Sequence, residues 1–462
     1  MKRFWLFVLL MAGSLAVLTS PAMAKPEEGS DDSSGTSLED INSALGGMSA
    51  HMNEIDKKLH LTIFGDVRGR YALWTQTQSD KNAPPPTTIT DKGIGRYRAR
   101  IGAKITRGDI AGGLRIATGG SANPNSENNT YANAFQQPAV DIDQAYLTYT
   151  PGFLNNVLKV TAGKMGNPLF FSPMTWDPDI NPEGAALEIS KSGLVFRADY
   201  FELVSNAGAA QPVTNLPSGT VTNTGAGADE YMANFQLEEN LKLDPVDVKL
   251  LVGYEYIPNA TALAGGNLAG IIIGPKSPLT TSNKPVGVGN IWDVGKIIPD
   301  FQVLEGAIQV KHKIGDVPMV WTAHLIDNIN SFKVPNGESL TNGPPAGSTY
   351  TTLSNELGGY LEVKAGDTNK GNFLGCLAAS YVEPNAQMAN LASDDANFTN
   401  TEYLFEQVGY GLEENVSLLL SVWELQRIYY NYYGALNNSA ITSGGTSRDP
   451  EFQIYMDCLL TL

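Results

Sequence analysis

The chain has 462 residues, a formal net charge of −17 and only 17% charged residues. An acidic balance of this size disfavours binding to the phosphate backbone of nucleic acids, so we expect no nucleic-acid partner. Hydrophobic residues make up 42% of the chain, yet beyond the N-terminus no apolar run reaches the roughly 18 residues of a membrane-spanning helix. The apolar residues must therefore follow a pattern of shorter period.

The N-terminus has the features of a secretory signal peptide. Lys2 and Arg3 precede an apolar run, and a break at Pro21 leads to the small-residue sequence Ala-Met-Ala at 22–24. A positive start, a short apolar segment and an A-x-A site are typical of export signals. We expect residues 1–24 to be removed by cleavage after Ala24, and the alternative is an uncleaved anchor.

Two further segments precede the main body of the chain. Residues 25–37 are acidic and contain serine and glycine, which predicts a flexible linker. Over 38–58 the apolar residues are spaced alternately by three and four, which is typical of a coiled-coil helix. Three copies could form a periplasmic trimerisation helix, and the alternative is a single amphipathic helix. The residues of this seam are Leu38, Ile41, Leu45, Met48, Met52 and Ile55.

From Leu59 onward the apolar pattern changes to a period of two. In LHLTIFGDVRGRYALW the odd positions are apolar or glycine, and RYRARIGAK repeats the alternation around Ile101. Strict alternation requires a strand whose two faces meet different surroundings. The polar faces of these two stretches share a set of arginines, namely Arg68, Arg70, Arg96, Arg98 and Arg100. A soluble sheet would explain either stretch alone, but not the recurrence of the pattern to the C-terminus.

Sixteen segments follow this pattern. They are 59–74, 95–106, 110–118, 139–150, 157–164, 185–190, 194–205, 230–238, 246–256, 302–313, 317–327, 351–365, 371–383, 402–411, 416–430 and 450–462. Short connections alternate with long ones rich in Asn, Thr, Pro and Gly, as in a barrel with tight turns at one end. The sequence predicts an all-β fold: over 59–462, a transmembrane antiparallel β-barrel of about 16 strands, with 18 as the other count considered. A closed barrel leaves no unpaired backbone in the bilayer.

One long connection, 165–184, differs from the others. It is stiffened by four prolines, and it contains Phe170, Phe171 and Trp176, which need a surface to pack against. We predict that it folds into the lumen and turns its acidic side chains toward the arginines, which narrows the pore. The predicted constriction comprises Arg68, Arg70, Arg96, Arg98, Arg100, Asp177, Asp179 and Glu183. The alternative is that Asp177 and Asp179 only form Asx turns that shape the loop.

Several stretches between residues 60 and 205 are similar to a known family. RYRARIGAKI, GLRIATGGSANP, DQAYLTY, TAGKMGNPLF and TWDPDINPEGAAL resemble the bacterial "putative porin" family, in the wider group of general diffusion porins. The resemblance implies an outer-membrane channel, a homotrimer, and a constriction made by the third long loop. It also implies a terminal phenylalanine, whereas this chain ends in Leu462.

The predicted function is therefore passive diffusion of small hydrophilic solutes and ions through an outer-membrane porin. Its expected surroundings are outer-membrane lipid and lipopolysaccharide, and we expect no cofactor and no metal. A surface adhesin or structural barrel is the alternative, and an outer-membrane enzyme is a further one. The four histidines accompany no nucleophile motif or metal-ligand spacing. Cys376 and Cys458 lie on opposite faces of separate strands, so no disulfide is expected.

Overall fold

The computed structural model describes residues 60–78, 87–119, 126–131, 139–204, 230–258, 301–335, 350–383, 386–387, 391, 401–427 and 451–462. The predicted signal peptide, linker and heptad helix lie outside these residues. No helix in the described part of the chain is long and apolar enough to span a membrane.

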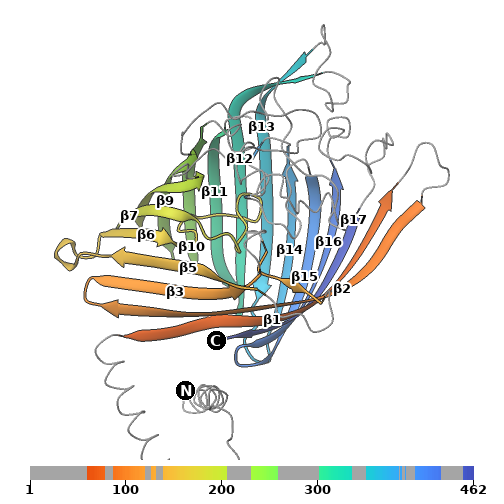
Figure 1. Ribbon diagram of the computed structural model, residues 1–462, viewed down its shortest axis with the longest axis horizontal. Helices are drawn as coiled ribbons and strands as arrows, with labels where there is room; N and C mark the ends of the chain where they lie inside the picture. Colours follow the sequence, from red (N-terminus) through yellow and green to blue (C-terminus); the bar gives the residue numbers. More distant parts are fainter. Residues whose placement is uncertain are drawn as a thin grey trace, which may run out of the picture. The chain divides into compact units, whose positions relative to one another are not determined.

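The described residues form a closed ring of sixteen antiparallel strands (Figure 1). Each strand pairs with the strands before and after it in the chain, and β1 closes the ring by pairing with β17 as well as β2. The additional two-residue strand β4 pairs only with β2. The strands are β1 (Leu61–Gln78), β2 (Thr87–Arg107), β3 (Ile110–Thr118), β4 (Asn129–Thr130), β5 (Val140–Tyr149), β6 (Leu158–Lys164), β7 (Glu183–Lys191), β8 (Leu194–Val204), β9 (Glu230–Leu243), β10 (Val246–Ile257), β11 (Phe301–Ile314), β12 (Val317–Pro335), β13 (Tyr350–Gly366), β14 (Phe373–Val382), β15 (Thr401–Glu413), β16 (Val416–Arg427) and β17 (Glu451–Thr461).

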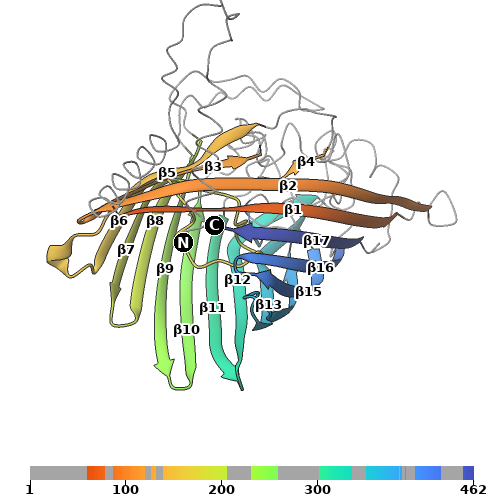
Figure 2. The same ribbon diagram turned by 90° about the horizontal axis from the view of Figure 1, so that it is seen from below.

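The sixteen predicted strands are all present, which confirms the predicted barrel. Tight turns join β9 to β10 and β11 to β12 at one end of the ring (Figure 2). Gly315 adopts φ of 60° in one of these turns, a conformation that glycine adopts without strain. The long connections lie at the opposite ends of the strands. The first strand begins at Leu61 and the last strand ends at Thr461. Both of these strand ends lie on the side of the ring that carries the short turns, because β1 and β17 lie next to strands that short turns connect on that side.

β1 and β2 are longer than the predicted strands, because they extend over most of 75–94, which the sequence assigned to a connection. Two pairings are locally irregular: that of β15 with β16 shifts between Gly411 and Glu413, and that of β3 with β5 shifts between Arg115 and Ile116. Tyr146 on β5 lies over Gly113 on the inward face.

The outward face of the ring is apolar, as the alternation predicts. Ile101 is 49% exposed, whereas the neighbouring Arg98 is 8% exposed. Large apolar side chains at this level of exposure recur on the outward faces around the ring, including Leu147, Val252, Leu325, Leu361 and Val408. Hydrocarbon is the surrounding that stabilises such a surface. Cys376 is buried inside the ring and Cys458 is exposed, and both are free, which confirms that they do not form a disulfide.

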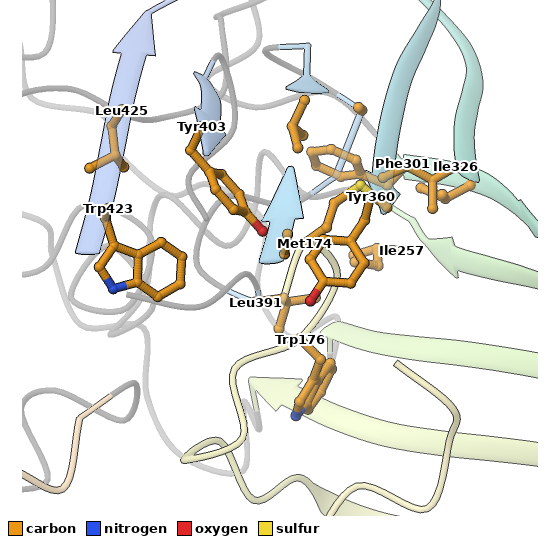
Figure 3. Close-up of a cluster of buried hydrophobic side chains, with 14 of the residues drawn as sticks. Met174, Trp176, Ile257, Phe301, Ile326, Tyr360, Leu391, Tyr403, Trp423 and Leu425 are labelled. Carbon is orange, nitrogen blue, oxygen red and sulfur yellow. The ribbon is translucent and has the colours of Figure 1, made fainter. Parts of the chain in front are cut away.

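The inward face of the ring is not polar along its whole length. Toward the long connections the inward side chains are apolar, and they form a buried cluster that includes Phe201, Met232, Phe301 and Tyr360 (Figure 3). These residues come from strands on several sides of the ring. Met174 and Trp176 of the β6–β7 connection and Ala386 and Leu391 of the β14–β15 connection pack in the same cluster, so parts of two connections lie inside the ring.

Candidate functional site

The connection between β6 and β7 turns into the ring of strands (Figure 1). Met174 is fully buried, and Trp176 is 3% exposed and contacts the Phe201 ring with centroids 6.2 Å apart. Thr175 and Trp176 donate backbone hydrogen bonds to the carbonyl of Ser172, which closes a turn. The aromatic residues thus reach the inner wall, where burial of their surface stabilises the loop.

Arg98 and Arg100 on β2 contact this loop at one wall. The Arg98 guanidinium donates to Asp179 Oδ1 at 2.9 Å and to Asp66 Oδ1 at 2.9 and 3.1 Å. Arg100 donates to Asp66 Oδ2 at 2.6 Å, and its Nη1 lies 3.5 Å from Asp179 Oδ1. The Arg98 and Asp179 side chains are 9% and 8% exposed. Since these groups are in direct contact, no water layer separates Asp179 from the arginines.

Further carboxylates complete this cluster. Arg100 Nη1 donates to Glu127 Oε2 at 3.0 Å, and Arg115 bonds Asp143. Glu127 lies in the connection between β3 and β5, and burial raises its pKa to about 8, with Asp179 acting in the same direction and Arg100 against it. A raised pKa leaves Glu127 largely protonated at neutral pH. Arg98, Arg100 and Arg115 are thus each in contact with carboxylate groups, which come from Asp66, Glu127, Asp143 and Asp179.

The two loop aspartates have different roles. Asp177 Oδ1 accepts from the backbone N–H of Asp179 at 2.7 Å, which is an Asx turn. Asp179 reaches the arginines, as described above. Glu183 does not: it begins β7, its side chain is 67% exposed, and it lies 3.0 Å from Lys164. It shares the outward side of β7 with Ile189, because residues six apart on a strand face the same way.

The remaining predicted arginines lie along the same wall. Arg70 forms a bidentate pair with Asp457 at 2.7 and 3.0 Å across the seam between β1 and β17. Arg68 donates to Asn128 Oδ1 at 2.7 Å, and Arg96 is buried. The carboxylates that pair with these arginines were not among the predicted site residues; they are Asp66, Glu127, Asp143 and Asp457. Alternation on β1 places Asp66 on the same face as Arg68, so that signal was available, whereas the other three depend on long-range pairing.

The loop is also attached to the wall at β9, β11 and β12. Gln236 on β9 exchanges two hydrogen bonds of 2.8 Å with the backbone of Phe170. Ser172 Oγ lies 2.9 Å from His324 Nδ1, and His324 Nε2 lies 3.0 Å from Glu305 Oε2. Gln236 also donates to Glu305 at 2.6 Å, which fixes this carboxylate. The loop is therefore held at two walls of the ring, by ion pairs on one side and by a buried hydrogen-bond network on the other.

Ser172, His324 and Glu305 have the residue types and contacts of a hydrolytic triad. Ser172 is 3% exposed and His324 is fully buried. A nucleophile must be reachable by its substrate, and these atoms are enclosed between the loop and the wall. Their geometry instead joins the loop to β11 and β12. Within the part of the chain that the structure describes, no cluster of three His, Cys, Asp or Glu side chains suited to a metal was found.

A closed ring of sixteen strands with an apolar outward face, and with an inward-folded loop after β6, the fifth strand of the ring, is the architecture of porin-type transmembrane β-barrels. Residues 50–259 match the model of the family described as "Putative porin". This match confirms the family resemblance found in the sequence.

The chain is similar to several solved structures. OprB of Pseudomonas putida is 10% identical, with a TM-score of 0.50, and the match covers 90% of this chain and 97% of that one. OmpF of Salmonella typhi is 13% identical over 87% of this chain and 97% of that one, with a TM-score of 0.45. The outer membrane channel DcaP of Acinetobacter baumannii is 11% identical over 88% and 98%, with a TM-score of 0.44. No curated protein matches the sequence.

Proposed function

We propose that this protein is an outer-membrane porin through which small hydrophilic solutes and ions diffuse passively. The observation that carries the proposal is a closed sixteen-strand barrel with an apolar outward face, in a chain matched to a porin family. In this proposal residues 1–24 are the export signal, and the barrel lies among outer-membrane lipid and lipopolysaccharide.

Conductance of the purified protein in a planar bilayer tests this proposal. We expect stepwise ionic current on insertion, because a barrel of this strand number can enclose an aqueous path. A protein that inserts but never conducts, in wild-type form or with the inward loop released, would instead be a structural barrel or adhesin. Labelling with a fluorophosphonate probe tests the enzyme alternative. The probe would label an active Ser172, and this label would be absent from the Ser172→Ala variant.

We also propose that the 165–182 connection narrows the path. Its attachment to Arg98 and Arg100 at one wall and to Gln236 and His324 at another supports this role. Because the loop aspartate is in contact with the arginines, solutes would not pass between them. The path would run beside the loop, and the ion pairs would act by holding it in place.

A homotrimer is the proposed assembly, and the 38–58 seam is its proposed trimerisation helix. The heptad spacing of Leu38, Ile41 and the later seam residues supports it. Deleting residues 38–56 should lower the temperature at which the native oligomer dissociates, measured by gel mobility after heating. Unchanged dissociation with an intact barrel would leave the seam without a role in assembly.

A further inference from the structure

A continuous row of ion pairs crosses the inward faces of neighbouring strands from β6 to β10. The row begins at Lys159 on β6 and ends at Lys249 on β10, and the residues between them are Glu188 on β7, Arg197 on β8 and Glu238 on β9. Each successive pair is in contact at 3.0 Å, so the charges alternate along the row. Because both ends are lysines, the row carries more cations than carboxylates.

The row lies between the inward β6–β7 connection and the short turns. Gln236 lies two residues before Glu238 on the same face of β9, and it bonds the backbone of Phe170 in that connection. Beyond Glu238, β9 runs on to the tight turn that joins it to β10 (Figure 2). Lys249 Nζ lies 5.6 Å from the centroid of the Phe170 ring. A solute that enters at the short-turn end therefore passes this row before it reaches the connection.

The lysines of the row are more accessible to water than the carboxylates that they contact. The Lys159 side chain is 41% exposed, and that of its partner Glu188 is 22% exposed. The Lys249 side chain is 28% exposed, and that of its partner Glu238 is 3% exposed. The carboxylates thus lie against the wall, and the ammonium groups project into the lumen.

Two more lysines extend this surface beyond β10. Alternation places Lys311 on β11 and Lys364 on β13 on the inward face, each within three residues of the short-turn end of its strand. The Lys364 side chain is 44% exposed, and that of its partner Glu362 is 12% exposed. Lys311 is exposed and pairs with Asp247 on β10, which on its other side pairs with Lys242 on β9. The lysine surface of the lumen therefore consists of Lys159, Lys249, Lys311 and Lys364.

From this arrangement we infer that the lysine surface makes the pore selective for anions, although the whole chain has a net charge of −17. Lysine and arginine side chains that line a lumen favour the entry of anions. The exposed carboxylates Asp244 and Asp316 belong to the tight turns at the rim, where salt screens charges over about 10 Å. The inference rests on the proposed porin function and names its class of solute: small anions that carry carboxylate or phosphate groups.

The reversal potential in a planar bilayer under a gradient of potassium chloride tests this inference. Wild type should prefer chloride, and the triple variant Lys159→Gln/Lys249→Gln/Lys364→Gln should lower the ratio of chloride to potassium permeability several-fold. The wall should remain folded, because Glu188 and Glu238 keep their contacts with Arg197. Lys191→Gln is the matched control, because Lys191 is exposed and pairs with Leu194 on the outward face. It should leave the ratio unchanged.

Solute flux into liposomes separates the effect of charge from that of pore width. The triple variant should slow the entry of a small dicarboxylate and leave the entry of a neutral sugar of similar size unchanged. Heat-modifiable gel mobility shows which variants have folded, and the single variants Lys159→Gln and Lys249→Gln decide the question if the triple variant does not fold.

The outcomes separate the inference from the function on which it rests. A wild-type pore that prefers potassium, or folded variants with the wild-type permeability ratio, would overturn the anion selectivity and leave the porin function in place. Absence of current from wild type and from all variants would overturn the porin function itself.

Discussion

Reversing the charge of Arg98 in an Arg98→Glu variant is expected to shift the reversal potential toward cation preference and to release the 165–182 connection from this wall. The new carboxylate would lie among Asp66 and Asp179, which Arg98 now contacts at 2.9 Å. Losing one partner of a buried ion pair costs about 3–5 kcal/mol. The loop therefore loses its attachment at this wall, while the lumen gains negative charge.

Bilayer recordings under a salt gradient measure both effects, as reversal potential and as current noise. The double variant Arg98→Glu/Asp179→Arg restores opposite charges at the same contact, and it should return the current noise to the wild-type level. Lys104→Glu is the matched control, because Lys104 is an exposed residue on the same strand that pairs with Thr62 and Gly113 near the short turn between β2 and β3. An unchanged reversal potential in Arg98→Glu would remove this residue from the constriction.

His324→Ala is expected to detach the other side of the loop and to raise conductance. His324 is fully buried and bridges Ser172 on the loop to Glu305 on β11. Its removal leaves a cavity and takes a partner from both groups, and an unsatisfied buried polar group costs about 1–3 kcal/mol. Since this cost falls on the docked loop and not on the strand pairing, the barrel should remain folded while the loop moves.

Conductance and heat-modifiable mobility together distinguish loop release from unfolding. His312→Ala is the matched control: His312 is partly exposed and accepts a hydrogen bond from the indole of Trp321 at 3.0 Å, away from the loop. It should leave conductance unchanged. Wild-type conductance in folded His324→Ala would show that the bridge does not restrict the path.

Much of the barrel follows from local chemistry. The period of two at Ile101 and its neighbours decides which side chains face hydrocarbon, and the turn residues decide where each strand ends. The predicted strands and the sixteen-strand count are accordingly confirmed. Strand ends were less predictable, because Thr-rich residues beyond 75 are compatible with either a strand or a loop until a neighbouring strand pairs with them.

The candidate site was predictable only in part. The arginines of β1 and β2 were found from alternation, and the proline-rich loop from its composition. The carboxylates that neutralise them were largely missed, because Asp457 reaches Arg70 only when the ring closes and Asp143 turns inward at an irregularity in pairing. Glu183 was predicted to lie with the loop acids because it is close to them in sequence. It is instead the first residue of β7, and the alternation of side chains along that strand turns it outward.

The sequence by itself determined the alternation, the strand count and the presence of an unusual loop, because each depends on neighbouring residues and on the two surroundings of a membrane strand. Only the tertiary structure decided that the arginines are paired instead of open to water, and that a second connection meets the first inside the ring. Those contacts join residues from about 80 to more than 380 positions apart, as for Arg98 with Asp179 and Arg70 with Asp457. Their energies arise from mutual burial, which no local pattern in the chain encodes.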